Sequence, residues 1–180
     1  MNQSLVTWWV DMKWLSLFTL FMLCSACAKE HGKPIANLTY LDVSGTEDGF
    51  YDLSFSSDVD LLSLFRPGEG FVGGWLKCAL AGDTDFSVEN VMQQSGYGPL
   101  ESVESGYSGS GFPFVASLSF RETDADGASS RPLSGSEVSV LLAGKQDIPC
   151  RYVATIFGAK PYYSGTLMMP VRDILREVHR

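Results

Sequence analysis

The chain has 180 residues, a length that fits one ordinary domain and is short for two. Hydrophobic residues make up 45% and charged residues 19%, so the composition supports a packed core and excludes global disorder. The formal net charge is −8, which argues against nucleic-acid binding because such proteins need a basic face. An acidic surface suits an exported domain and favours a basic partner.

The first segment has the three parts of a secretory signal. Lys13 precedes an uncharged apolar run over residues 14–23, and small residues follow that run. The run is shorter than the roughly 20 residues that a membrane-spanning helix needs. The pattern therefore predicts a signal peptide over residues 1–27 and export of the rest of the chain.

The end of this segment offers two processing routes. Residues 24–27 read CSAC and resemble the lipobox of bacterial lipoproteins, in a variant form with Cys24 where Leu is usual. The resemblance concerns the signal region alone. It implies acylation of Cys27, anchoring by several acyl chains, and outer-membrane retention facing the periplasm, since Ala28 and not Asp follows. The alternative is ordinary cleavage after Ala28, which would release a soluble periplasmic or secreted protein.

The four cysteines reduce to one pair after processing. Cys24 leaves with the signal, and Cys27 is either acylated or removed. Cys78 and Cys150 remain, and an oxidising compartment favours a disulfide between them. The alternative is two separate buried thiols.

The mature chain has the pattern of one β-rich domain. Residues 28–34 are polar and are expected to form a tether, followed by a single domain over residues 35–180. We predict a mainly β fold with β-sandwich-like antiparallel sheets, seven to nine strands and a short C-terminal α-helix. The clearest strand candidates are residues 50–56, 71–80, 114–121, 137–143, 151–158 and 162–169.

The C-terminal helix is the most regular element. Pro170 suits the first turn of a helix because its missing N–H needs no partner there. Val171, Ile174, Leu175 and Val178 then fall on one apolar face. A helix this short is marginal alone, so we expect it to pack on the domain.

Residues 95–113 differ in composition, being rich in Gly, Ser and Tyr. Such residues suit adaptable binding loops, and a long loop in a compact domain is often functional. We therefore interpret the segment either as a mobile loop or as a contact surface. The candidate contact residues are Tyr97, Glu101, Glu104, Tyr107 and Phe112.

Catalytic and metal-binding patterns are not found in the sequence. His31 falls in the expected tether and His179 next to the last residue, where neither suits a catalytic base. Residues 122–133 resemble a calcium loop only at their start, because Leu133 stands where the loop needs Glu. We expect no enzyme activity, no metal and no cofactor.

Three functions remain open at this stage. The leading hypothesis is a non-enzymatic envelope lipoprotein, held to the membrane by its lipid and binding a protein partner, as immunity-type proteins do. The alternative is a small-ligand or glycan-binding periplasmic module. Its candidate aromatic side chains are Trp75, Tyr97, Tyr107, Phe112, Tyr162 and Tyr163, with Trp75 more typical of a core position. The third is a hydrolase acting on peptidoglycan or lipid, with a buried carboxylate of raised pKa.

Overall fold

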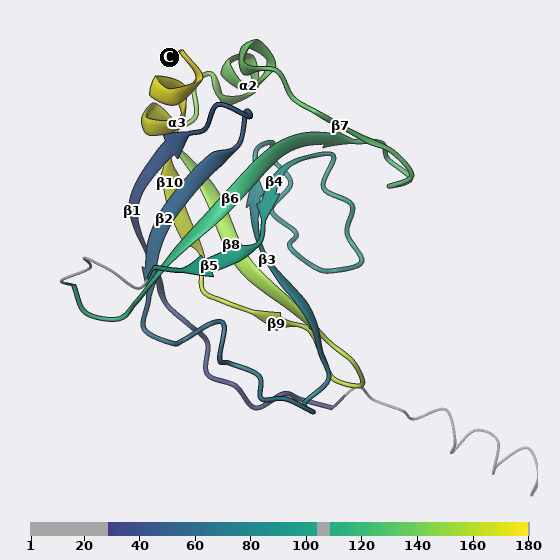
Figure 1. Ribbon diagram of the computed structural model, residues 1–180. Helices are drawn as coiled ribbons and strands as arrows, with labels where there is room; N and C mark the ends of the chain where they lie inside the picture. Colours follow the sequence, from purple (N-terminus) through teal and green to yellow (C-terminus); the bar gives the residue numbers. More distant parts are fainter. Residues whose placement is uncertain (1–28, 104–108, 180) are drawn as a thin grey trace, which may run out of the picture.

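The computed structural model describes residues 29–103 and 109–179, so the predicted signal peptide and Cys27 lie outside the described residues. As predicted, the described chain is mainly antiparallel β structure with a short C-terminal helix (Figure 1). The elements are β1 (Leu38–Gly45), β2 (Tyr51–Ser57), β3 (Phe71–Ala79), β4 (Gln94–Gly98), β5 (Leu100–Ser102), β6 (Phe112–Thr123), β7 (Ser130–Pro132), α2 (Gly135–Leu142), β8 (Asp147–Ile156), β9 (Tyr162–Tyr163), β10 (Leu167–Pro170) and α3 (Val171–Val178).

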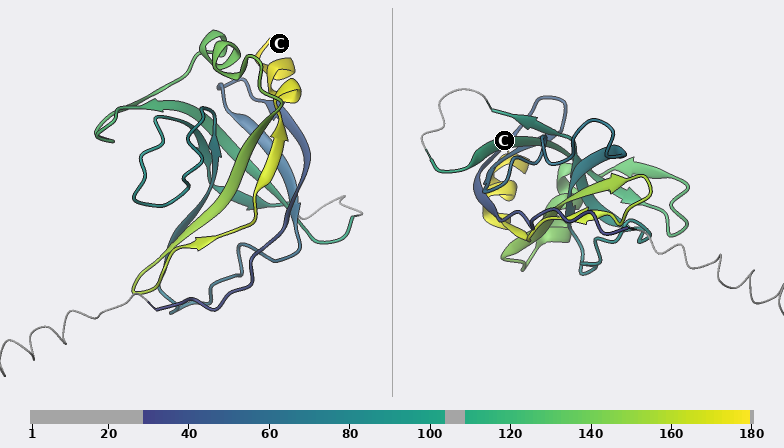
Figure 2. Two further views of the ribbon diagram at one scale, coloured as in Figure 1. Left: turned by 180° about the vertical axis from the view of Figure 1, so that it is seen from behind. Right: turned by 90° about the horizontal axis from the view of Figure 1, so that it is seen from below.

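The strands form one strongly curled sheet. Their order is β1-β2-β6-β4-β3-β8-β10, while β5 and β7 pair with β6, and β9 pairs with β8. The first half of β6 pairs with β2 and β5, and its second half pairs with β4 and β7. This strand therefore belongs to both halves of the sheet. The curl brings β1 close to β10, and the two halves face each other across the core (Figure 2).

Strict alternation along β6 builds the centre of the core. Phe114, Ala116, Leu118 and Phe120 point inward and are buried, while the residues between them are partly exposed. Buried and exposed side chains alternate in this way along antiparallel strands that have one face in the core and the other in solvent. The neighbouring strand β2 adds Leu53 and Phe55 in the same way, and Phe55 packs against Phe114 with ring centroids 5.7 Å apart. The strand predicted over residues 114–121 is confirmed.

A disulfide joins Cys78 to Cys150, as predicted. The two residues are directly paired across β3 and β8, and both are fully buried. The bond links positions 72 residues apart, so it ties the middle of the chain to its last third.

The C-terminal helix α3 covers one end of the curled sheet (Figure 1). Val171 and Ile174 are buried, which confirms the predicted apolar face. The Tyr40 hydroxyl donates to Asp173 at 2.9 Å, and the Gly45 N–H donates to Glu177 at 3.3 Å. Both bonds fasten the helix to β1. No helix within residues 29–103 and 109–179 has the length and apolar character to cross a bilayer.

The strand predicted over residues 137–143 is wrong, because this segment lies in the helix α2. Ser134 caps the helix, and its hydroxyl accepts from the Glu137 N–H at 3.4 Å. The Glu137 carboxylate in turn accepts from the Ser134 N–H at 2.8 Å. This reciprocal capping box outweighs the β preference of the valines that follow. The helix lies beside α3 at the same end of the sheet (Figure 1).

The segment expected to be a tether lies along the domain from Lys29 onward. Lys29 bridges to Ala159, and the Lys160 N–H donates to the Lys29 carbonyl at 2.9 Å. The buried Tyr162 hydroxyl accepts from the Ala36 N–H and donates to the Pro34 carbonyl, each at 2.9 Å. The first described residue, Lys29, therefore lies beside the turn between β8 and β9, at the end of the domain opposite the helices (Figure 1).

Candidate binding surface

The segment predicted to be a long loop, residues 95–113, holds strand structure over residues 95–98, 100–102 and 112–113, and its described remainder is irregular. Tyr97 lies on β4, Glu101 lies on β5, and Phe112 begins β6. Glu104 and Tyr107 lie outside the described residues. The structure therefore puts two of the candidate contact residues, Tyr97 and Glu101, on neighbouring strands that are separated by Pro99 and pair with β6 in one register.

Glycines hide the strand period of this stretch in the sequence. The inward positions of β4 hold Gly96 and Gly98, both buried, while Tyr97 between them is exposed. A Cβ atom at position 98 would lie 2.0 Å from the Ser117 carbonyl oxygen. The chain needs glycine here because its backbone passes directly over β6. Gly96 and Gly98 therefore mark a close contact between strands and not a loop.

One edge of β5 has no strand paired with it in the described chain. The Val103 N–H donates to the Pro113 carbonyl at 3.2 Å, so Val103 and Glu101 direct their backbone groups toward β6. Backbone groups alternate in direction along an antiparallel strand. The backbone N–H and C=O groups of Leu100 and Ser102 therefore point away from β6, toward the open edge.

The first half of β3 has a second open edge. β3 pairs with β8 from Phe71 onward, but its pairing with β4 starts only at Leu76. A bulge at Val72 shifts the register in this half. The Leu80 N–H donates to the Gln94 carbonyl at 3.1 Å, and alternation back along the strand directs the backbone of Gly74 away from β8. Within the described residues, β5 and the first half of β3 thus present two unpaired edges that face each other beyond the end of the β3–β4 pairing.

An exposed aromatic pair stands where these edges diverge. Trp75 is 45% exposed and Tyr97 is 37% exposed, and their ring centroids are 6.1 Å apart in an edge-to-face arrangement. The expectation that Trp75 belongs to the core is therefore wrong, because its position on β3 faces outward. Lys77 lies directly across from Tyr97, and burial lowers the pKa of its ammonium group. We call Trp75, Tyr97 and the two open edges the edge surface.

The remaining predicted aromatics do not join this pair. Tyr162 is fully buried in the core, and its ring lies tilted by 58° against that of Tyr152, with centroids 6.2 Å apart. Tyr163 packs on a small separate cluster that includes Phe86 and Met92. The groove imagined from these side chains as one group therefore does not form from the members that the structure describes.

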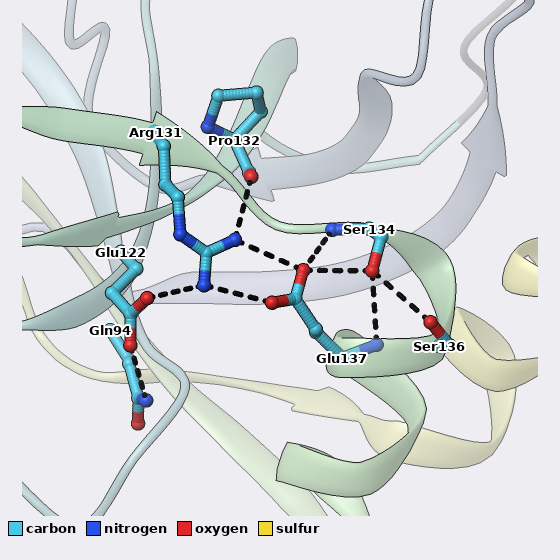
Figure 3. Close-up of polar contacts among 7 residues, drawn as sticks. All are labelled: Gln94, Glu122, Arg131, Pro132, Ser134, Ser136 and Glu137. Carbon is cyan, nitrogen blue, oxygen red and sulfur yellow. Dashed lines mark hydrogen bonds and ion pairs between the residues drawn. The ribbon is translucent and has the colours of Figure 1, made fainter.

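A polar cluster beside α2 has a structural role (Figure 3). Arg131 on β7 contacts Glu137 at 2.8 Å and also binds Glu122 on β6. Gln94 donates to Glu122 at 3.3 Å. The Arg131 and Ser134 hydrogen bonds lower the pKa of Glu137 to about 2. These groups satisfy one another and fix α2 to the sheet.

The described residues hold no group of three or more His, Cys, Asp or Glu side chains that would suit a metal ion. His31 accepts from the Lys33 N–H at 3.0 Å and packs its ring against Tyr162 and Phe65. His179 caps α3. No protein-family model matches the chain, and neither a curated protein nor a solved structure matches it. The edge surface is therefore the candidate site on geometry alone.

Proposed function

We propose that the protein is a non-enzymatic lipoprotein of the outer membrane, anchored through Cys27 and facing the periplasm, whose domain binds a partner protein. The partner adds an extended segment to the edge surface. The observation that supports this proposal is the pair of unpaired strand edges on β5 and β3, flanked by exposed Trp75 and Tyr97.

Strand addition follows from the chemistry of an open edge. The outward N–H and C=O groups of the exposed Ser102 can bind the backbone of an incoming strand. Natural proteins usually protect such edges, so an edge left open suggests a partner. Trp75 and Tyr97 supply rigid aromatic area, which is typical of energetic centres in interfaces.

The charge of the surface favours a basic partner. Glu101 is exposed on the outer face of β5, and Asp52 lies on the same face of β2, where it accepts from the Ser117 hydroxyl at 2.6 Å. The whole chain carries a net charge of −8. Opposite charge on the partner would raise its association rate. In an immunity-type role, that partner would be a basic toxin directed at the periplasm.

A proline at position 102 tests this mechanism. Ser102→Pro removes an outward N–H from the edge while leaving the bonds to β6 intact, whereas Ser102→Ala keeps that N–H. A photoreactive p-benzoylphenylalanine at position 101 reports what lies against the edge in cells. We expect one specific protein adduct that persists with Ser102→Ala and is lost with Ser102→Pro.

Two results would contradict the proposal. One is an adduct that survives Ser102→Pro. The other is a probe at position 101 that captures no protein, while a probe at Glu47, in the turn between β1 and β2, captures one. The melting temperatures of both Ser102 variants serve as the folding control.

Glycan binding is a second candidate, favoured by the exposed Trp75 beside Tyr97. A sugar stacked on Trp75 would change its fluorescence on titration with envelope saccharides. Strand addition predicts no saturable change, because sugars cannot replace a peptide backbone at the edge.

A further inference from the structure

We infer that the end of the domain opposite the helices contacts the lipid bilayer, so that the domain stands on the membrane in one orientation. We call this region the anchor end; it comprises Lys29–Lys33, residues 58–72 and the turn between β8 and β9. The inference rests on the proposed lipid anchor at Cys27. It adds a second, non-covalent contact with lipid.

Large apolar side chains are exposed together at the anchor end. Phe157 is 85% exposed and Val72 is 68% exposed, the first in the turn after β8 and the second in the β3 bulge. The Phe157 N–H donates to the Gly70 carbonyl at 2.7 Å, which holds this turn against the start of β3. Phe71 and Leu62 are half exposed and line one shared hollow. The hollow beside Phe157 shares Phe65 and Gly70 with this one, so Leu62, Phe71 and Phe157 belong to one surface.

The length of chain before the domain identifies the bilayer as the occupant of this surface. Two peptide steps separate Cys27 from Lys29, an extended reach of about 7 Å. Lys29 is bridged to Ala159, which is two residues after Phe157. An acylated Cys27 would hold its lipid chains at the membrane surface, so the same short reach would hold Phe157 there too.

The local charge also favours lipid contact at this end. A hollow of about 450 Å³ next to Phe157 is lined by Lys29, Lys33, Glu30 and Glu69, whose charges cancel. The whole chain, by contrast, carries −8. Anionic membrane surfaces repel acidic protein surfaces, so the electrically balanced end approaches with the least opposition. Exposed aromatic and aliphatic side chains beside lysines are typical of surfaces that lie in the membrane interface.

Photo-crosslinking of the full chain in bacterial envelopes tests the inference. The probe p-benzoylphenylalanine replaces Phe157, where a larger aromatic ring meets no packed neighbour. The matched control places the same probe at Phe50, an exposed phenylalanine in the turn between β1 and β2 beside the helices. We expect phospholipid adducts on the peptide that contains residue 157 when the probe is at that position. We expect none on the peptide that contains residue 50 when the probe is there instead.

The mass of the N-terminal peptide from the same sample reports acylation of Cys27 separately. An acylated protein with no lipid adduct at residue 157, or with a protein adduct there, overturns the inference and leaves the proposed anchor standing. A protein without acyl chains overturns the proposed anchor. Lipid adducts at residue 157 in that protein would still support the anchor end as a lipid-binding surface. Equal lipid adducts at positions 157 and 50 would also refute a fixed orientation.

Discussion

Removal of the disulfide should cost the domain a large part of its stability. The Cys78–Cys150 bond closes a loop of 72 residues. Constraint of the unfolded chain by a loop of this length is worth about 4 kcal/mol in the chain-entropy model. Total domain stabilities are about 5–15 kcal/mol, so the double variant Cys78→Ala/Cys150→Ala approaches the limit of folding. For a domain of this size the loss corresponds to a fall in melting temperature of roughly 8–16 °C.

Urea unfolding followed by tryptophan fluorescence measures this effect. Once residues 1–26 are removed, Trp75 is the sole tryptophan, and it lies on β3, three residues before Cys78. The variant should unfold at lower urea with a steeper dependence on urea, because its unfolded chain is less constrained and exposes more surface.

The reduced wild-type protein provides the matched control. Both cysteines are fully buried, so the alanines also leave small cavities that reduction does not. The difference between reduced wild type and the double variant then reports the local packing of the two thiols against the alanines, whereas the loss that both samples share reports the loop constraint. A loss below about 1 kcal/mol in both samples would refute the reasoning, because the loop constraint would then be absent from the unfolded state.

Two smaller predictions follow from other contacts. Arg131 holds the pKa of Glu137 at about 2 against an ordinary 4.5, so Glu137 stabilises α2 fully above pH 4.5 and loses this effect as pH falls toward 2. The gap in melting temperature between wild type and Glu137→Gln should close over that range in a series of thermal melts; a constant gap would contradict it. Gly74→Ala should cost roughly 1–3 kcal/mol in urea unfolding, because its Cβ would lie 2.0 Å from the Tyr152 hydroxyl oxygen. Gly82→Ala, with open space around it, should change little, and equal effects would argue against the predicted clash.

Much of the fold was predictable because local sequence and tertiary packing agree there. The alternation along residues 114–121 matches a strand with one buried face, and β6 has that form. The spacing of Val171 and Ile174 matches α3, whose apolar face packs on the sheet, whereas Pro170, predicted in the first turn, is the extended N-cap residue that ends β10. The Cys78–Cys150 pair needed only counting, because the predicted signal peptide takes up the other two cysteines.

The errors arise where one signal masks another. Val138 and Val140 favour a strand, but the Ser134–Glu137 capping box starts a helix, and that motif was visible in the sequence. Gly96 and Gly98 suggested a loop, whereas they allow β4 to pass closely over β6. This second error was less avoidable, because the close contact depends on residues from distant parts of the chain.

The candidate site was harder to predict, because an open edge depends on which strands pair with one another and not on which residue types the strands contain. Tyr97 and Glu101 were identified from composition alone, without the strands that carry them. The edges exist because β6 is long enough to pair successively with β5 and β4, whereas β3 pairs with β4 and not with β5. β5 and the first half of β3 therefore each keep an unpaired edge, and these two edges face each other in the described chain. The same curl that encloses the core thus leaves backbone groups free for a partner, and the lipid anchor proposed at the opposite end from the helices would fix how that partner approaches.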